Sequence, residues 1–110
     1  METVKFDDWK KLNLKVGEIK EVDSHPNADK LYFLKVDIGD KIINLVAGIK
    51  NYYAPEDLIG RKIIVFTNLE PAIIRGVKSE GMLLAAEDTN NNVVSLLCPD
   101  SDVENGSSIR

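Results

Sequence analysis

The side chains that most often carry catalysis or bind metals are scarce in this sequence. His25 is the only histidine and Cys98 is the only cysteine, so no histidine pair or cysteine cluster with ligand spacing exists. A single cysteine also excludes an internal disulfide. Pro26 favours extended backbone at the residue before it, so we interpret His25 as a turn residue and predict no metal and no cofactor.

Paired carboxylates are the remaining candidates for acid–base chemistry. The pairs are Asp7-Asp8, Glu56-Asp57 and Glu87-Asp88. We interpret them as helix caps and strand-edge charges, because they fall at expected helix starts and at a strand end. No nucleophile, base and orienting group can be assembled from the spacing of any motif, and no phosphate-binding loop is present. We therefore predict that the chain is not an enzyme.

Short strands are expected to position any site. Residues 30–38 alternate with a period of two, and Gly39-Asp40 turns the chain into residues 41–47, which predicts a hairpin. The pattern of residues 14–22 skips a step at Gly17. Such a skip is typical of a β-bulge, which lets one long strand serve both sides of a small barrel.

The middle of the chain completes the predicted fold. Residues 52–60 carry proline and acids at their start and glycine at their end, which predicts one or two helical turns. Residues 62–67 and 82–87 are further β-rich runs, and the long connection 68–81 between them is a candidate functional loop. Five strands with a helical connection between the third and fourth match the OB-fold. The predicted fold class is therefore all-β, a five-stranded barrel with short helical turns.

The two ends of the chain are predicted to cover and extend the barrel. Phe6, Trp9 and Leu12 fall at helical spacing, so we expect an amino-terminal turn that packs Trp9 on the core. At 110 residues the chain fits one domain, with the barrel over about residues 12–87 and an extension over about 88–110. The extension holds apolar residues that a closed barrel does not need, so we predict that it forms a homodimer interface. These residues are Val93, Val94, Leu96, Leu97, Val103 and Ile109.

The charge balance constrains the partner. A formal net charge of −4 by itself argues against nucleic acid. After Lys78 the only basic residue is Arg110, so an anion-binding surface must come from earlier in the chain. The first residues lack the features of a secretory signal, and no apolar run approaches the roughly 20 residues of a membrane span. We therefore expect a soluble, cytoplasmic protein with no membrane partner.

Several blocks of the sequence, in this order and spacing, together resemble one family. They are His25-Pro26-Asn27-Ala28-Asp29-Lys30-Leu31; Val36-Asp37 with Gly39; Val46-Ala47-Gly48-Ile49; Tyr53 with Pro55-Glu56-Asp57-Leu58 and Gly60; Asn68-Leu69 with Pro71-Ala72; Arg75-Gly76; and Ser79-Glu80-Gly81-Met82-Leu83-Leu84-Ala85. The family is the tRNA-binding domain that is appended to many methionyl-tRNA synthetases and that also occurs as free-standing tRNA-binding proteins.

The resemblance implies an OB-fold that recognises the outer corner of folded tRNA by shape and performs no chemistry. It also implies that a free-standing member dimerises through its carboxy-terminal extension, in agreement with the apolar residues found there. A methionyl-tRNA synthetase is a second candidate partner, to which the chain would lend tRNA affinity. Some relatives in this fold resemble export chaperones that hold unfolded polypeptide, and the acidic net charge keeps this alternative open.

The predicted tRNA-binding residues combine cations, polar groups and apolar surfaces. Arg75 offers phosphate a planar set of donors, and Lys30 and Lys78 add point charges. A base can stack on Phe33, and Ser79 can donate to a phosphate or a ribose hydroxyl. The full set is Lys30, Phe33, Asn68, Arg75, Lys78, Ser79 and Met82.

Three positions depart from the family's usual pattern. Glu70 and Ile73 stand where the loop commonly carries lysines, and Ile43 stands where many members carry arginine. Few cations therefore remain near the inferred face, so we predict modest, salt-sensitive binding.

Overall fold

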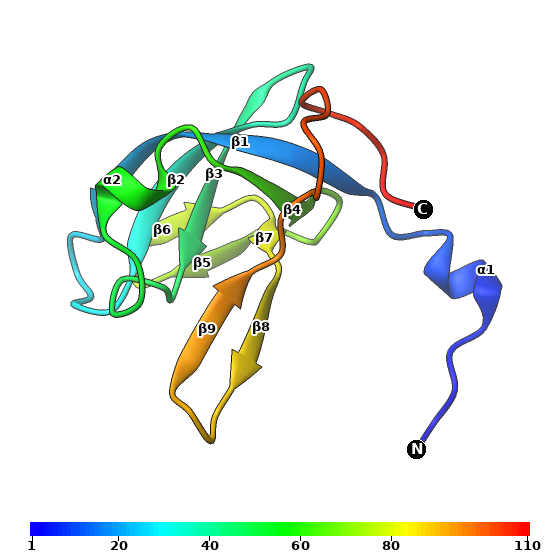
Figure 1. Cartoon of the computed structure of the whole chain (residues 1–110), viewed down its shortest axis with the longest axis horizontal. Helices are drawn as coiled ribbons and strands as arrows, with labels where there is room; N and C mark the ends of the chain where they lie inside the picture. Colours follow the sequence, from blue (N-terminus) through cyan, green and yellow to red (C-terminus); the bar gives the residue numbers. More distant parts are fainter.

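Five antiparallel strands form the barrel that the sequence predicts (Figure 1). They lie in the order β3-β2-β1-β4-β7 in the computed structural model, which describes residues 1–110. Their bounds are β1 Leu14–Ser24, β2 Tyr32–Asp37, β3 Ile42–Ala47, β4 Lys62–Phe66 and β7 Met82–Leu83. The Glu80 amide, just before β7, donates to the Asn44 carbonyl of β3 at 2.8 Å. This bond joins the two edges of the sheet, so the barrel is nearly closed.

The long strand β1 serves both halves of the barrel, as its sequence pattern predicts. Its first half pairs with β4 and its second half with β2. The register shifts between Ile19 and Glu21, a little further along the strand than the predicted bulge at Gly17. Gly17 has another function, because a Cβ atom there would lie 2.6 Å from the side chain of Val36.

Alternating side chains of β1 to β4 fill the barrel. The inward face predicted for residues 30–38 is buried, and the helix α2, Pro55–Leu58, adds the fully buried Leu58. The main core consists of Ile19, Tyr32, Leu34, Val36, Ile38, Ile43, Leu45, Ala47, Ile49, Leu58, Ile63, Val65 and Leu96. The all-β OB-fold prediction, with its helix between the third and fourth strands, is confirmed.

The segment after β4 differs from the prediction. The expected fifth strand over residues 82–87 is split, because only β7 stays in the barrel. The next strand, β8 Ala85–Asp88, pairs instead with β9 Val93–Leu96 in a hairpin that projects from the barrel (Figure 1). The connection 68–81 contains a second hairpin of β5 Ala72–Ile74 and β6 Val77–Ser79. Strands of two to four residues are too short for their period to be recognised.

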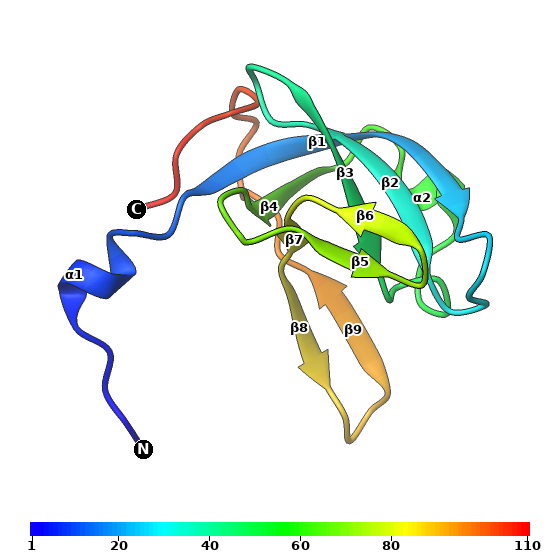
Figure 2. The ribbon, with the colours of Figure 1, turned by 180° about the vertical axis from the view of Figure 1, so that it is seen from behind.

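The prediction that Trp9 packs on the core is wrong. Helix α1, Phe6–Trp9, forms where the spacing predicts it, but none of its residues is buried and Trp9 is 43% exposed. Figure 2 shows α1 standing apart from the barrel. Helical spacing identifies an apolar side, but it does not tell whether that side meets the core of the same chain.

The carboxy-terminal residues are part of the barrel's own structure. The Val16 amide donates to the Ser107 carbonyl at 2.9 Å, and the Gly106 amide donates back to Val16 at 2.7 Å. Leu96 belongs to the core, and Val94 packs against it. The segment after residue 87 thus contributes to the core, and Leu96 needs no second chain for its burial.

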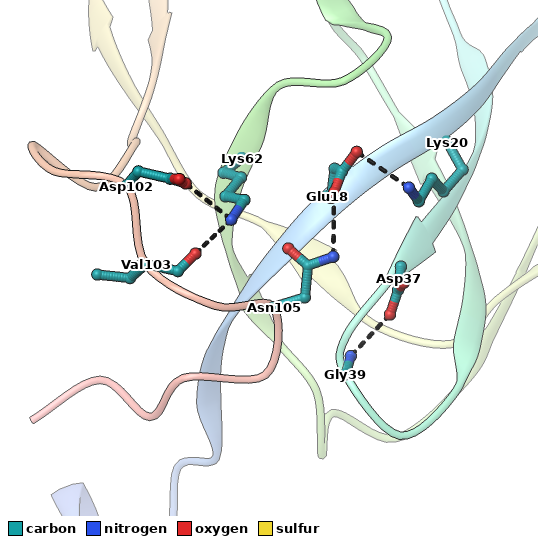
Figure 3. A network of polar contacts seen from close by, with 8 residues as sticks. All are labelled: Glu18, Lys20, Asp37, Gly39, Lys62, Asp102, Val103 and Asn105. Carbon is teal, nitrogen blue, oxygen red and sulfur yellow. Dashed lines mark hydrogen bonds and ion pairs between the residues drawn. The ribbon is translucent and has the colours of Figure 1, made fainter.

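Polar contacts fasten the carboxy-terminal segment to β1 and β4 (Figure 3). Asn105 Nδ2 donates to Glu18 Oε1 at 3.1 Å, and Lys20 Nζ lies 3.0 Å from Oε2 of the same carboxylate. The hydrogen bond from Asn105, and next the one from Lys20, lower the pKa of Glu18 below its ordinary value of 4.5. Lys62 Nζ lies 2.9 Å from Asp102 Oδ1, which holds the preceding part of the segment.

Candidate nucleic-acid interface

Two segments that are far apart in the sequence meet beyond the end of β1. The loop of residues 25–31 joins β1 to β2, and the His25 amide closes it by donating to the Leu31 carbonyl at 3.0 Å. The tip of the β5–β6 hairpin lies against this loop, because Asn27 Nδ2 donates to the Arg75 carbonyl at 3.0 Å. Figure 2 shows the hairpin lying in front of β3.

A hollow of about 470 Å³ opens where the loop meets the hairpin tip. It is lined by Asn27, Ala28, Asp29, Lys30, Leu31 and Arg75. The fold thus brings together two cations that the sequence singled out separately. Neither forms an ion pair within the chain, so both charges are available to an anion.

The backbone of the hairpin tip presents the Arg75 side chain to solvent. Arg75 and Gly76 connect β5 to β6 and have φ angles of 52° and 86°. A two-residue hairpin turn with positive φ at both positions is the tight turn that follows the natural twist of the strands. Arginine is uncommon in this left-handed region, where asparagine and glycine predominate.

A second, mainly apolar hollow of about 280 Å³ lies on the other side of the same loop. It is lined by Asp23, Ser24, Pro26, Phe33 and Val77. Phe33 lies on the outer side of β2, opposite the buried Tyr32, and is partly exposed. A partly exposed ring beside apolar side chains suits a flat ligand such as a nucleobase.

Lys78 and Met82 lie on other parts of the surface near the hairpin. Lys78 is exposed and is the cross-strand partner of Ile73, which is 70% exposed. Position 73, where the family that the sequence resembles commonly carries a lysine, is therefore next to Lys78. Met82 is half exposed on β7 opposite Phe66 and lines neither hollow.

Ser79 and Asn68 use their polar side chains for hydrogen bonds within the fold. Ser79 is only 5% exposed, and its Oγ accepts from the Val46 amide at 3.1 Å and donates to the Gly81 carbonyl at 3.0 Å. Asn68 Oδ1 accepts from the Asn13 amide at 2.8 Å. The hydroxyl of Ser79 thus makes two hydrogen bonds within the fold, and Asn68 holds the entry to β1.

Position 43 does not face solvent. Ile43 is buried in the core, so this departure from the family pattern removes no charge from the outer surface of this chain. Gly81 also has an internal function, because a Cβ atom there would lie 2.6 Å from the Phe66 carbonyl.

No group of three or more potential metal-ligating side chains comes together in the structure. Neither helix has the length and apolar composition of a membrane span. Sequence reasoning assigned no function to the His25 side chain, although the block around it was recognised. The ring is 5% exposed and bonds to both segments that form the hollows.

An OB barrel with free cations and an aromatic ring beside its long connection defines a domain of the class that binds nucleic acids. The profile of the family described as "Putative tRNA binding domain" matches residues 14–108, and the chain belongs to this family.

Relatives with this domain include both synthetases and small proteins. The chain is 56% identical over its full length to methionine–tRNA ligase of Pyrococcus horikoshii and 50% identical to that of Methanocaldococcus jannaschii, but it spans only 15% and 17% of their lengths. The structure of a methionyl-tRNA synthetase related protein from Pyrococcus horikoshii matches with a TM-score of 0.91 and 34% identity, covering all of both chains. The CsaA chaperone of Picrophilus torridus matches with a TM-score of 0.89 and 36% identity, over 98% of this chain and all of the other.

Proposed function

We propose that this chain is a non-catalytic, structure-specific tRNA-binding protein that contacts the outer corner of folded tRNA as a cytoplasmic homodimer. The observation that carries the proposal is the single hollow lined by both Lys30 and Arg75. Membership of the tRNA-binding family and the similarity to methionine–tRNA ligases support tRNA as the ligand.

The cationic hollow fits phosphates of the RNA backbone. The Arg75 guanidinium offers two parallel donors to one phosphate, and the Lys30 ammonium can neutralise its neighbour. Lys78 supplies a third exposed cation on the outward side of the hairpin. Three phosphate contacts give a slope of log affinity against log salt of about 2 to 3 in magnitude, which is modest for an RNA-binding protein.

The second hollow fits one unstacked base from a loop at the tRNA corner. Its ring would lie against Phe33 and Val77, which are two of the apolar side chains that line the hollow. Only Asp23 and Ser24 among the lining residues can address a base edge. With so few polar groups, recognition would depend on the shape of the tRNA more than on its sequence.

A second copy of the chain and a synthetase are the proposed protein partners. Val93 and Leu97 expose apolar side chains on and just after β9, which favours a homodimer. The chain corresponds to 15% of the length of the Pyrococcus horikoshii methionine–tRNA ligase, and its proposed contribution to aminoacylation is to lend tRNA affinity to a synthetase.

Polypeptide binding is the second candidate function. Two chaperone structures support it, the CsaA proteins of Picrophilus torridus and Bacillus anthracis, with TM-scores of 0.89 and 0.87. The apolar hollow beside Phe33 is open to a peptide side chain as well as to a base, and the net charge of −4 repels RNA.

A gel-shift titration with three ligands separates the two functions. Total folded tRNA should bind saturably and weaken as salt is raised, whereas a single-stranded oligonucleotide of matched length should bind less tightly. An unfolded polypeptide should not displace the tRNA. Saturable polypeptide binding without retention of tRNA would favour the chaperone function and contradict the proposal.

A further inference from the structure

The imidazole of His25 is enclosed between the two segments that carry Lys30 and Arg75. The Asn27 backbone amide donates to His25 Nδ1 at 2.9 Å, and His25 Nε2 lies 2.9 Å from the Ile74 carbonyl. One ring nitrogen therefore contacts the residue that begins the loop turn, and the other contacts the last residue of β5. The ring is 5% exposed, so water does not readily replace either bond.

The two partners determine which ring nitrogen carries the proton. A backbone amide can only donate and a backbone carbonyl can only accept, so Nδ1 must be the bare nitrogen and Nε2 must carry the hydrogen. Both contacts are satisfied only by this neutral tautomer. An imidazolium would keep the Nε2–H bond to Ile74 but direct a second N–H at the Asn27 amide, so the Asn27 backbone would have to move.

We infer that His25 is a positioning residue: its neutral ring holds Ile74 and Asn27, which fixes the Arg75 turn beside Lys30, and protonation of the ring displaces Asn27 and loosens the turn. The Asn27 side chain provides a parallel tie, since its Nδ2 donates to the Arg75 carbonyl at 3.0 Å. This inference rests on the proposed tRNA binding for its effect on affinity, but the release itself can be measured without RNA.

The sign of the pH effect distinguishes release from simple electrostatics. Charged residues near His25 in the chain include Asp23 on β1 and Asp29 and Lys30 in the loop, and Arg75 directly follows Ile74, which contacts the ring. Histidine is the only one of these side-chain types that ordinarily changes charge between about pH 5 and 8, and His25 is the only histidine. A new positive charge here would strengthen RNA binding by Coulomb attraction, whereas release of the turn would weaken it.

The first experiment uses the free protein. With one histidine, a two-dimensional long-range proton–nitrogen NMR spectrum contains a single imidazole, which should show the Nε2–H tautomer near neutral pH. Acidification should lower the protection factor of the Asn27 amide, because a proton on Nδ1 removes its acceptor. An Nδ1–H tautomer, or protection that does not change, would overturn the inference.

The second experiment measures tRNA affinity against pH. We expect wild-type affinity to fall about tenfold between about pH 7.5 and 5.5, the effect of losing one or two hydrogen bonds that order the site. His25→Gln, which does not titrate, should bind more weakly at neutral pH and show a flat profile. Asn27→Ala removes the tie between Asn27 and the Arg75 carbonyl, so it should bind more weakly at neutral pH and lose less affinity on acidification than the wild type.

The outcomes separate this inference from the proposed function. Wild-type affinity that stays flat or rises on acidification would overturn the positioning role of His25. A profile for His25→Gln that falls like the wild type would do the same. Absence of tRNA binding at every pH would contradict the proposed function. The NMR experiment would then be the only test of the His25 contacts.

Discussion

Arg75 sits at a left-handed turn position that asparagine also adopts, so its charge can be removed without straining the turn. Arg75→Asn should weaken binding to all tRNAs by a similar factor and reduce the magnitude of the salt slope by about 1, because one phosphate contact is lost. Arg75→Lys keeps the charge and should keep the slope. Titrations at several salt concentrations measure both quantities.

An unchanged salt slope in Arg75→Asn would remove the hairpin tip from the RNA-binding face. A loss of affinity confined to some tRNAs would indicate base reading at this position in place of backbone contact.

A variant of Ser79 distinguishes a role in the stability of the fold from a role in tRNA binding. The Ser79 hydroxyl bonds to Val46 and Gly81 in a buried position, so Ser79→Ala leaves an amide and a carbonyl without partners. We expect the free energy of unfolding to fall by about 1–3 kcal/mol, measured by urea denaturation. Ser95→Ala, at an exposed position of β9, is the matched control and should change it by less than about 0.5 kcal/mol.

The same variant decides whether Ser79 also contacts RNA. Folded Ser79→Ala protein should bind tRNA with the wild-type salt slope. A stability equal to the wild type, together with weaker tRNA binding, would restore the RNA contact that the sequence predicts.

At the scale of elements, the attachment of the carboxy-terminal segment depends on the ionisation of Glu18. Its pKa is lowered in the folded protein by the bond from Asn105 and then by Lys20, so folding favours the carboxylate. The resulting stabilisation is present above the ordinary value of 4.5 and is lost as the pH falls through the lowered value.

Glu18→Gln tests this attachment. The variant should be less stable than the wild type near pH 7, and the difference should shrink as the pH falls through the lowered pKa of Glu18, because the wild-type carboxylate is then protonated as well. Urea unfolding at a series of pH values gives the comparison. Glu21→Gln alters a more exposed carboxylate of the same strand and should show a smaller difference. Parallel pH profiles of Glu18→Gln and wild type would contradict the role of Glu18.

The sequence supports the prediction of an element only where the element is long enough to show a pattern. The alternation of residues 30–38 predicts β2 and its two faces, because a six-residue strand displays three positions on each side, and the turn at Gly39-Asp40 predicts the pairing with β3. The hairpin inside 68–81 has strands of three residues, and a turn with Arg75 in place of Asn or Gly gives no hairpin signal.

The candidate site was predictable as a set of residue types but not as an assembly. Lys30 and Arg75 could be chosen from their motifs, whereas their shared hollow depends on bonds from His25 and Asn27 to backbone carbonyls. Backbone carbonyls are the same in every residue, so sequence cannot reveal such partners. The internal bonds of Ser79 to backbone groups could not be predicted for the same reason.

At the scale of the whole molecule, the dimer prediction needs a subtler test than truncation. Removing residues 88–110 would delete Leu96 from the core and the segment that pairs with β1, so loss of the dimer could not be separated from unfolding. Val93 and Leu97 offer a better test, because their side chains are 47% and 40% exposed while their backbones remain in the sheet hydrogen bonding.

We expect the intact chain to be a dimer in light scattering at micromolar concentration, because exposed apolar side chains on β9 gain free energy by leaving water, about 25 cal/mol for each Å² covered. Val93→Lys combined with Leu97→Lys should give a monomer with an unchanged circular dichroism spectrum. Ile73→Lys is the matched control, since it makes the same change at an exposed position of the β5–β6 hairpin. It should remain a dimer and bind tRNA more tightly, because it adds a cation beside Lys78. A monomeric mass for the intact chain, or an unaltered mass for the double variant, would place the dimer interface elsewhere or exclude it.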